Sequence, residues 1–375
     1  MVPLSVVQVL PALNGGGVER GTLEVARELV RCGHRSVVIS AGGRLVPQLL
    51  AEGSEHLSWP LGAKSPLTLR WVGPLRRWLA EQHIDILHAR SRLPAWIAWL
   101  AWRSLDPARR PRFVTTVHGL YSVSAYSAIM TRGERVIAVS ETVRDYLHQH
   151  YPRLPAERIV VIPRGVDPAA FPHGYVPAPE WRTAWERQYP QLRGAPLLTL
   201  PGRLSRLKGH EDFIELMSQL RAHGLPVRGL IVGGVEPRRQ RYAESLRQQV
   251  QARGLDEAIV FTGHRSDMRE IYAVSTLVLS LSAQPESFGR TVLEALSLGT
   301  PVLGYARGGV GEILTRLYPA GLIPPGDRAA LLERTLALLR TAPAVPMEPA
   351  FPLQRMLDET LALYATLGAP PGARL

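Results

Sequence analysis

Short apolar runs alternate with longer amphipathic stretches along almost the whole chain. In the first half, the candidate strands are SVVQVL, RSVVIS, IDILHA, RFVTTV and RVIAVS, and the segments between them are helical in composition. In the second half, helical stretches alternate in the same way with PLLTL, GLIVGG, AIVFTG, TLVLSL, TPVLGY and AGLIP. Such alternation predicts parallel sheets covered by helices. We therefore expect an α/β protein with two doubly wound, Rossmann-like domains that face a central cleft.

A stretch rich in proline and aromatic residues, 169–194, separates the two halves of this pattern. We interpret it as the interdomain connection. The N-terminal domain is then expected over 1–168 and the C-terminal domain over 195–345. A last helix is predicted over 353–367, after a proline-rich segment. A length of 375 residues is sufficient for two domains with separate cores.

Cysteine content and the first residues of the chain bear on its compartment. The single cysteine, Cys32, excludes an internal disulfide and a cysteine-based metal site, and it favours a reducing cytosol. The opening MVPLSVVQVL has no basic region and leads into a glycine-rich loop, so we interpret it as a strand and not as a signal peptide. No apolar run approaches the roughly 20 residues of a transmembrane helix.

The net charge of +12 comes almost entirely from arginine, and the first half of the chain carries the larger share. Arginine suits phosphate groups and anionic lipid headgroups. A GC-rich genome would also produce this composition. A nucleic-acid partner is not expected, because the sequence has neither a known binding motif nor a dense basic stripe with interleaved aromatic residues.

Two glutamates, Glu286 and Glu294, stand eight positions apart in PESFGRTVLEALSLGTPV. The preceding TLVLSL suits a buried parallel strand, and RTVLEALSL predicts a helix that ends at Gly299. Glu286 then lies in the loop after a strand, at the carboxyl end of the sheet, where open α/β folds bind ligands. A helix start favours an anion and carboxylates accept from sugar hydroxyls, so the stretch suits a nucleotide sugar. Two solvated helix-end glutamates are the alternative.

Two cations, Arg203 and Lys208, lie in GRLSRLKGH, between the first strand and the first helix of the second half. They could neutralise a diphosphate leaving group. This matters because the sequence has no Asp-x-Asp pair and no His/Asp cluster to hold a divalent metal, so no metal site is expected. The alternative is a pair of exposed loop cations.

The first half offers a histidine and a glycine-rich loop. His118 ends the candidate strand RFVTTV, where it could bind a sugar hydroxyl or carry a proton, although a lone histidine is more often structural. Gly16 and Gly17 belong to NGGGVERG, which lets the backbone approach a ligand closely or makes a plain tight turn. The run does not fit G-x-G-x-x-G, so a dinucleotide site is not expected.

Six of the eight tryptophans lie between Trp59 and Trp102. Within ARSRLPAWIAWLAWRS, three of them follow helical spacing and arginines flank them. Tryptophan and arginine together suit a bilayer interface, but the spacing also fits a buried helix face. Arg90 or Arg92 could instead meet phosphates of a lipopolysaccharide core.

Taken together, these motifs resemble the retaining group 1 glycosyltransferases with the GT-B fold, a family that includes lipopolysaccharide core and envelope polysaccharide glycosyltransferases. The resemblance covers nearly the whole chain. Its motifs are VHG at 117–119, VIAVSETV at 136–143, VIPRGVD at 161–167, GRLSRLKGH at 202–210, IVFTGHRSDM at 259–268 and the glutamate, seven residues, glutamate signature within 285–313.

The resemblance implies a role for each matching residue. Arg203 and Lys208 would hold the nucleotide diphosphate, Glu294 the ribose hydroxyls and Glu286 the transferred sugar. His118 would contact the donor sugar near the reacting carbon. Further donor contacts would come from loop residues: Phe288, Gly289, Arg290, Gly263, His264, Arg265, Gly16 and Gly17. The helix over 353–367 would pack back on the N-terminal domain, which would bind the acceptor.

Two positions depart from the family. Arg164 stands where the family usually has asparagine, and the adjacent pair Gly233–Gly234 replaces a more widely spaced glycine pair. The family's mechanism implies that the diphosphate leaves, that the acceptor hydroxyl attacks from the same face, and that a diphosphate oxygen takes the proton.

The predicted protein is therefore a metal-independent, retaining glycosyltransferase that uses a nucleotide-diphosphate sugar and no other cofactor. Its acceptor would be a lipopolysaccharide-core or other lipid-linked envelope glycan. It would be cytoplasmic and would associate reversibly with the anionic inner face of the cytoplasmic membrane. The alternatives are a nucleotide-sugar epimerase of the same fold and a non-catalytic glycan- or membrane-binding relative.

Overall fold

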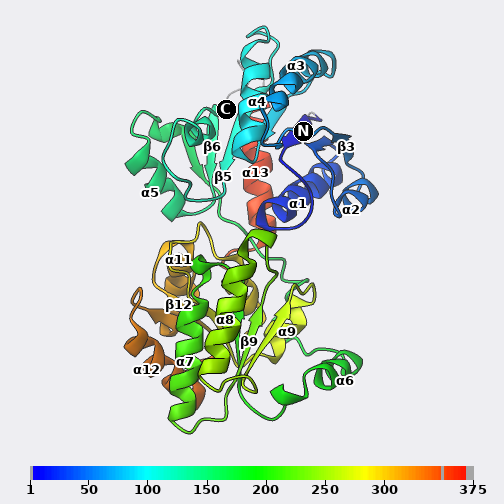
Figure 1. Cartoon of the computed structure of the whole chain (residues 1–375). Helices are drawn as coiled ribbons and strands as arrows, with labels where there is room; N and C mark the ends of the chain where they lie inside the picture. The colour runs from blue at the N-terminus through cyan, green and yellow to red at the C-terminus, as the bar shows by residue number, and fades with distance from the viewer. Residues whose placement is uncertain (1–2, 348–349, 369–375) are drawn as a thin grey trace. The chain divides into compact units, whose positions relative to one another are not determined.

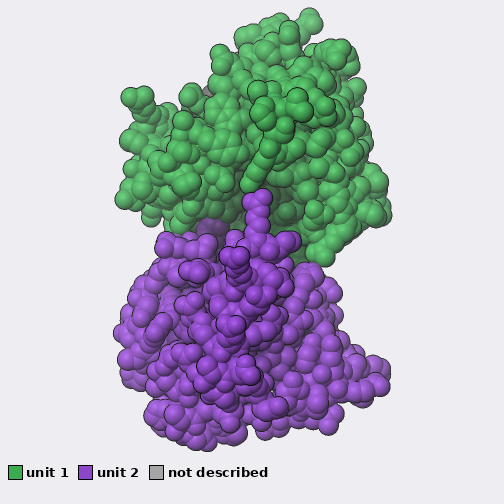
Figure 2. Space-filling view, viewed as in Figure 1, with its two compact units in different colours: residues 1–164, 354–375 green, residues 165–353 purple. Residues whose placement is uncertain are grey.

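The computed structural model describes residues 3–347 and 350–368 of the chain. These residues form two compact units (Figure 2). Unit 1 comprises Met1–Arg164 and Gln354–Leu375, and unit 2 comprises Gly165–Leu353. Each unit contains one parallel sheet with helices packed around it (Figure 1). This is the doubly wound α/β architecture that the alternating pattern predicts, and the fold class is confirmed.

The sheet of unit 1 has the strand order β3-β2-β1-β4-β5-β6-β7, and every neighbouring pair is parallel. Its strands are β1 Ser5–Val9, β2 Arg35–Ser40, β3 Glu55–Ser58, β4 Ile86–Ala89, β5 Arg112–Val117, β6 Arg135–Ala138 and β7 Ile159–Val161. Its α-helices are α1 Gly17–Arg31, α2 Val46–Ala51, α3 Val72–Glu81, α4 Arg92–Arg103 and α5 Glu141–His150. The edge strands β3 and β7 were not among the apolar runs of the sequence, because they are short and partly exposed.

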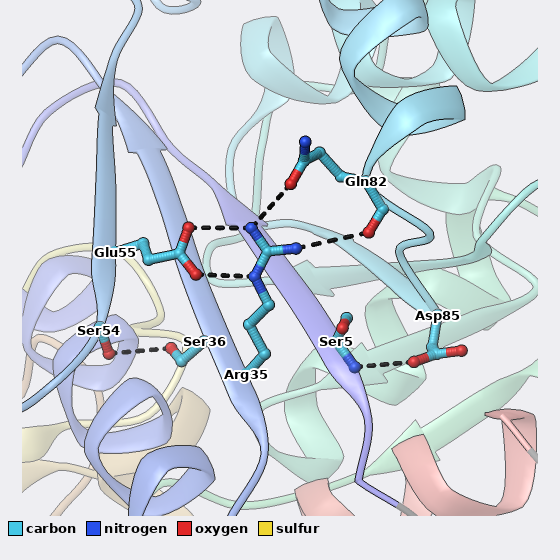
Figure 3. A network of polar contacts seen from close by, with 7 residues as sticks. All are labelled: Ser5, Arg35, Ser36, Ser54, Glu55, Gln82 and Asp85. Carbon is cyan, nitrogen blue, oxygen red and sulfur yellow. Dashed lines mark hydrogen bonds and ion pairs between the residues drawn. The ribbon is translucent and has the colours of Figure 1, made fainter.

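Side-chain contacts join the starts of neighbouring strands in unit 1 (Figure 3). Arg35, which begins β2, donates to both carboxylate oxygens of Glu55 at 2.7 and 2.9 Å and to Oε1 of Gln82 at 2.9 Å. Nearby, the backbone N–H of Ser5 donates to Asp85 Oδ2 at 2.7 Å. These contacts occupy the amino edge of the sheet, so the opposite, carboxyl edge is the one left to the loops that carry the candidate site residues.

The last helix, α13 (Leu353–Gly368), returns to unit 1 after the chain has passed through unit 2. The hydroxyl of Tyr364 lies 2.6 Å from Nδ1 of His88 in β4, and both side chains are buried. Gln354 donates to Glu28 of α1 at 3.0 Å. The helix therefore completes the core of unit 1, and its Tyr364 fixes the orientation of the His88 ring through this hydrogen bond.

The sheet of unit 2 has the order β10-β9-β8-β11-β12-β13, again with parallel neighbours. Its strands are β8 Leu197–Pro201, β9 Arg228–Val232, β10 Ile259–Gly263, β11 Leu277–Ser280, β12 Val302–Tyr305 and β13 Leu322–Ile323. Its α-helices are α6 Pro179–Gln188, α7 His210–Ala222, α8 Gln240–Ala252, α9 Met268–Val274, α10 Arg290–Ser297, α11 Gly308–Leu317 and α12 Arg328–Arg340. The strand order reverses between β8 and β11, which makes their carboxyl ends the switch point where such sheets bind ligands.

The segment 169–194 is part of unit 2 and not a connection between domains. Trp185, Tyr189 and Leu192 pack with Leu197 and other strand residues in one hydrophobic cluster. The aromatic residues recur every four positions, so they form one face of α6 and its end, and they cover the sheet. The chain passes from unit 1 to unit 2 between Arg164 and Gly165. Proline content was misleading here, because the aromatic spacing determines the packing.

Candidate functional site

The loops that follow β8 and β11 lie side by side because these strands are neighbours in the sheet. Leu277 and Val278 of β11 pair with Leu198 and Thr199 of β8. Beyond the strands, the backbone N–H of Ala283 donates to the carbonyl of Leu207 at 2.8 Å. Residues about 75 positions apart in sequence are thereby placed at one edge of the sheet.

Lys208 and Glu286 meet at this edge. The ammonium of Lys208 lies 2.7 Å from Oε1 of Glu286, and the hydroxyl of Ser282 donates to the same oxygen. The side chains of Lys208 and Glu286 are 29% and 21% exposed. Burial alone would raise the pKa of Glu286, but the charge and hydrogen bond of Lys208 outweigh it, so the pKa is lowered from 4.5. The pair is therefore ionic and open to a ligand.

Glycines allow the close packing that brings this pair together. Gly209 has φ of 71°, and a Cβ there would lie 1.9 Å from the carbonyl oxygen of Leu281. Gly308 and Gly309 at the start of α11 press against the loop of Glu286, and the N–H of Gly309 donates to the Glu286 carbonyl at 2.8 Å. The sequence motif contained both glycines, but their support of Glu286 was not foreseen.

Glu294 lies in α10, behind the loop of Glu286. It is buried, and Nε of Arg290 approaches its Oε1 to 3.2 Å, one helical turn away. Gly289 precedes the helix with φ of 102°, in the region that favours glycine. Phe288 is buried, so it contributes backbone and not an exposed ring.

Arg203 lies in the same loop as Lys208 but has a different partner. Its side chain is 73% exposed and pairs with Glu236 at 2.5 Å, in the loop after β9. The two loops touch closely, because a Cβ on Gly233 would lie 1.9 Å from the carbonyl oxygen of Gly202. The departure at Gly233–Gly234 thus has a packing reason.

β10 ends at Gly263, and His264 and Arg265 follow in the next loop, two strands away from β8. Gly263 has φ of 72°, and a Cβ on Gly234 would approach Cβ of His264 to 3.7 Å. Arg265 pairs with Asp267 at 2.5 Å, which raises its pKa. The Arg265 guanidinium therefore forms an ion pair within its own loop. His264 lies next to Gly234, in the loop that follows β9.

In unit 1, His118 directly follows β5, at the strand end that the sequence predicts. Its Nδ1 lies 2.8 Å from Nη2 of Arg164. Burial lowers the pKa of His118 well below its ordinary value, and the nearby Arg164, Arg90 and His88 add to this. The ring is neutral near neutral pH.

Gly16 and Gly17 begin α1 at the same edge of the unit 1 sheet. Gly16 has φ of 158°, and a Cβ there would lie 2.6 Å from the carboxylate of Glu19. A Cβ on Gly17 would meet nothing within 4 Å. The backbone conformation at Gly16 thus favours glycine. At Gly17, the first residue of α1, a side chain would have room.

The structure corrects the prediction for Arg90. Its side chain is only 3% exposed and donates to Oε1 of Gln8 at 2.7 Å, so it is not a surface residue that could meet a glycan. Arg92 is partly exposed, and its guanidinium lies 4.6 Å from the centre of the Tyr121 ring. Burial of Arg90 was unforeseeable from composition, because the acceptor that makes it tolerable is Gln8, near the carboxyl end of β1.

Within residues 3–347 and 350–368, no group of three or more His, Cys, Asp or Glu side chains is placed to hold a metal ion. Nor does any helix of that part of the chain have the length and apolar character needed to cross a membrane.

Two Rossmann-like units, each with candidate residues at the carboxyl edge of its sheet, define the GT-B class. Residues 15–170 match the family model described as Glycosyltransferase Family 4, and residues 182–345 match the model described as Glycosyl transferases group 1. Together the models span most of the chain. The chain belongs to the group 1 glycosyltransferases, and it is an enzyme of that kind.

Individual proteins agree with this assignment. A glycosyltransferase from Rickettsia africae has a similar structure, with a TM-score of 0.84, 28% identity and coverage of 98% of this chain and 99% of that one. HepE of Anabaena, solved with UDP and glucose, shares the fold at a TM-score of 0.82 and 20% identity, over 97% of this chain and 100% of that one. The 2-deoxystreptamine N-acetyl-D-glucosaminyltransferase of Streptomyces fradiae is 36% identical over 142 residues, 37% of this chain and 32% of that protein. The matched part is thus about a third of that relative's length.

The Lys208–Glu286 pair predicts how stability depends on pH. Because the folded pKa of Glu286 is lowered, the pair stabilises unit 2 above pH 4.5 and its contribution is lost as the pH falls through the folded pKa. Lys208→Met should lower the free energy of unfolding of unit 2 at neutral pH by about 1–2 kcal/mol, between the values for surface and buried pairs. Urea titrations of both proteins from neutral to acidic pH measure the difference.

The difference should shrink as the pH falls below 4.5 and through the lower folded pKa of Glu286. Lys64→Met, at the only other lysine in the sequence, is the matched control and should not show this dependence. A Lys208→Met deficit that is constant from neutral to acidic pH would contradict the ion pair.

Proposed function

We propose that the protein is a retaining glycosyltransferase that moves a sugar from a nucleotide-diphosphate sugar to a hydroxyl of a lipopolysaccharide-core or other lipid-linked envelope glycan. The observation that carries the donor assignment is the Lys208–Glu286 pair at the switch point of the unit 2 sheet. A cation and a carboxylate held together there match the two parts of the substrate, an anionic diphosphate and a polyhydroxylated sugar.

The donor would replace contacts that exist in the free protein. A diphosphate oxygen would take Lys208 from Glu286, which would free the Glu286 carboxylate to accept from hydroxyls of the transferred sugar. Arg203 is exposed and its guanidinium pairs with the partly exposed Glu236, so it can turn to the diphosphate at little cost. Glu294 would accept from the ribose, and the backbone of Phe288, Gly289 and Arg290 would donate to the sugar or phosphate.

The chemistry we propose places the negative charge of the leaving diphosphate on Lys208 and Arg203, without a metal ion. Fixed cations aimed at a developing anion stabilise the transition state more than the ground state. The acceptor hydroxyl would attack from the face that the diphosphate leaves, and its proton would pass to a diphosphate oxygen. HepE, which shares the fold, was solved with UDP and glucose, and this supports a nucleotide sugar as donor.

The test is turnover with a panel of nucleotide sugars and truncated lipopolysaccharide cores. Nucleoside diphosphate should be released only when an acceptor is present, EDTA should leave the rate unchanged, and NMR of the product should show the donor's anomeric configuration. Release or interconversion of the nucleotide sugar without acceptor would favour an epimerase. Binding of glycan without turnover of any donor would favour a non-catalytic relative, and an inverted anomer would contradict retention.

We further propose that unit 1 docks reversibly on the anionic inner face of the cytoplasmic membrane, so that the cytoplasmic enzyme reaches a lipid-linked acceptor. Of the three tryptophans of α4, Trp102 is buried and donates to the Pro111 carbonyl at 2.7 Å, and Trp96 and Trp99 are only partly exposed. The short helix Pro66–Trp71 is a better candidate. Its Leu67 and Leu69 are 70% and 56% exposed.

Basic side chains lie on the short helix and on the neighbouring α3. Arg70 lies between the leucines and Trp71, and Arg76 and Arg77 are exposed on α3, which packs against the short helix. Exposed apolar side chains beside arginines suit insertion at the headgroup level of an anionic bilayer. The ring of Trp59 stacks on the ring of Trp71, with 5.4 Å between the ring centres, and this contact would hold the short helix in place.

This docking predicts that the chain sediments with vesicles that contain anionic lipid and that binding fades as salt rises. The double variant Leu67→Gln/Leu69→Gln should reduce binding about a hundredfold or more, since each leucine loses roughly 1.5–3 kcal/mol of burial when fully inserted. Leu50→Gln, at a leucine of α2 that is 52% exposed and so comparable with Leu69, is the matched control and should bind normally. Equal failure to bind anionic and neutral vesicles at low salt would dismiss docking and leave the transferase assignment standing.

A further inference from the structure

Gly21 stands in the interior of α1, where glycine is less favourable than alanine. The reason lies in Arg164, which follows β7 at the end of unit 1. A Cβ on Gly21 would lie 2.0 Å from Nη1 and 2.8 Å from Cζ of Arg164. The helix therefore carries a glycine at the point where the guanidinium passes.

Arg164 is enclosed on several sides within unit 1. Its side chain is 8% exposed, Nη1 faces Sδ of Met356 in α13 at 3.9 Å, and Nη2 lies 2.8 Å from Nδ1 of His118. A guanidinium has only donors and stays protonated. In this contact, Nδ1 of His118 must therefore be the acceptor, which leaves the ring hydrogen on Nε2.

We propose that Arg164 is a positioning residue that holds His118 as the neutral tautomer with its hydrogen on Nε2, and that Gly21 provides the space for it. His118 then acts on its ligand as a hydrogen-bond donor and not as a proton acceptor. The link to catalysis rests on the proposed function, in which His118 contacts the sugar substrate. The link between Gly21, Arg164 and the His118 tautomer does not.

The surroundings favour the same form of the ring. Arg164 and Arg90 are both buried near His118, and a positive imidazolium there would face two guanidinium groups. Two further titratable neighbours are His88 and Tyr121. His88 lies between Tyr364 and Thr116, at 2.6 Å from each hydroxyl, and burial lowers its pKa well below the ordinary value. Burial raises the pKa of Tyr121, so its hydroxyl stays neutral.

The tautomer has a chemical consequence for sugar transfer. As the acceptor oxygen bonds to the anomeric carbon, the bond from that carbon to the diphosphate breaks and the acceptor hydroxyl releases a proton. Nε2 of His118 already carries its hydrogen and Nδ1 is occupied by Arg164, so the ring cannot take this proton. It passes to the departing diphosphate, while Nε2–H can donate to an oxygen of the sugar.

The first test reads the tautomer directly by NMR of the full chain with ¹⁵N-labelled histidine. Loss of one set of signals in His118→Gln assigns the ring. At neutral pH the wild-type ring should be neutral with its hydrogen on Nε2. Arg164→Met, which fills the space beside Met356 but has no donor, should give a mixture of tautomers. Arg164→Lys keeps a cationic donor and should preserve the wild-type form.

Gly21→Ala is an independent route to the same state, because the added Cβ displaces the guanidinium from His118. It should shift the tautomer as Arg164→Met does, and the double variant should show no further shift. Arg112→Met, at the opposite end of β5 from His118, is the matched control and should leave the His118 signals unchanged. A wild-type ring with its hydrogen on Nδ1, or a spectrum unchanged in both Arg164→Met and Gly21→Ala, would overturn the proposal.

Kinetics then separates positioning from binding. Arg164→Met and Gly21→Ala should lower kcat about tenfold to a hundredfold, as loss of an orienting partner typically does, with little change in KM for the donor. His118→Gln, whose amide can donate from a similar position, should retain more activity than His118→Ala. Equal loss in these two variants would contradict the donor role. If no donor is turned over, the proposed function fails, and the NMR spectra still decide the tautomer.

Discussion

The contact between Lys208 and Glu286 depends on one topological constraint, the adjacency of β8 and β11 in a parallel sheet. The chain runs outward from β8 through β9 to β10 and then crosses back to place β11 on the other side of β8. Their carboxyl ends therefore open next to each other. The glycines at 209, 308 and 309 let the flanking backbone close to within van der Waals distance. Without that approach, a cation and a carboxylate from distant parts of the chain would not share a hydrogen bond.

Unit 1 is distinguished by the burial of two cationic side chains. Arg90 and Arg164 lie inside the unit, where an uncompensated charge would be costly. Arg90 donates to Gln8 in the central strand, and Arg164 donates to His118. Each of the two guanidinium groups thus has a polar acceptor, Gln8 near the carboxyl end of β1 or His118 directly after β5. Such an arrangement favours a precise orientation of His118 over maximal stability.

The sequence predicted those features that rest on local pattern. Buried strands such as β8 and β11 are apolar runs, and Glu286, Lys208 and His118 follow strands where expected. It did not predict the short edge strands β3 and β7, because half-exposed strands lack an apolar run. It assigned α6 to a connection because proline suggested a linker, although Trp185 packs in the core.

Partners of side chains were the least predictable feature. The pairing of Arg203 with Glu236, the burial of Arg90 and the space that Gly21 provides all depend on which loops the topology brings together. Spacing along the chain contains no such information. The departures at Arg164 and at Gly233–Gly234 were visible in the sequence, but only their contacts explain them.

The central claim is that the edge formed by β8 and β11 holds a nucleotide diphosphate through Lys208. Calorimetric titration with UDP, GDP, ADP and dTDP tests it most directly, because it requires neither the acceptor nor the sugar. For whichever of these binds wild type most tightly, Lys208→Met should weaken binding about tenfold to a hundredfold, the usual value of a charge-assisted hydrogen bond. Arg206→Met, at the exposed arginine two positions earlier, should bind like wild type. Unchanged affinity in Lys208→Met, or an equal loss in Arg206→Met, would contradict the account.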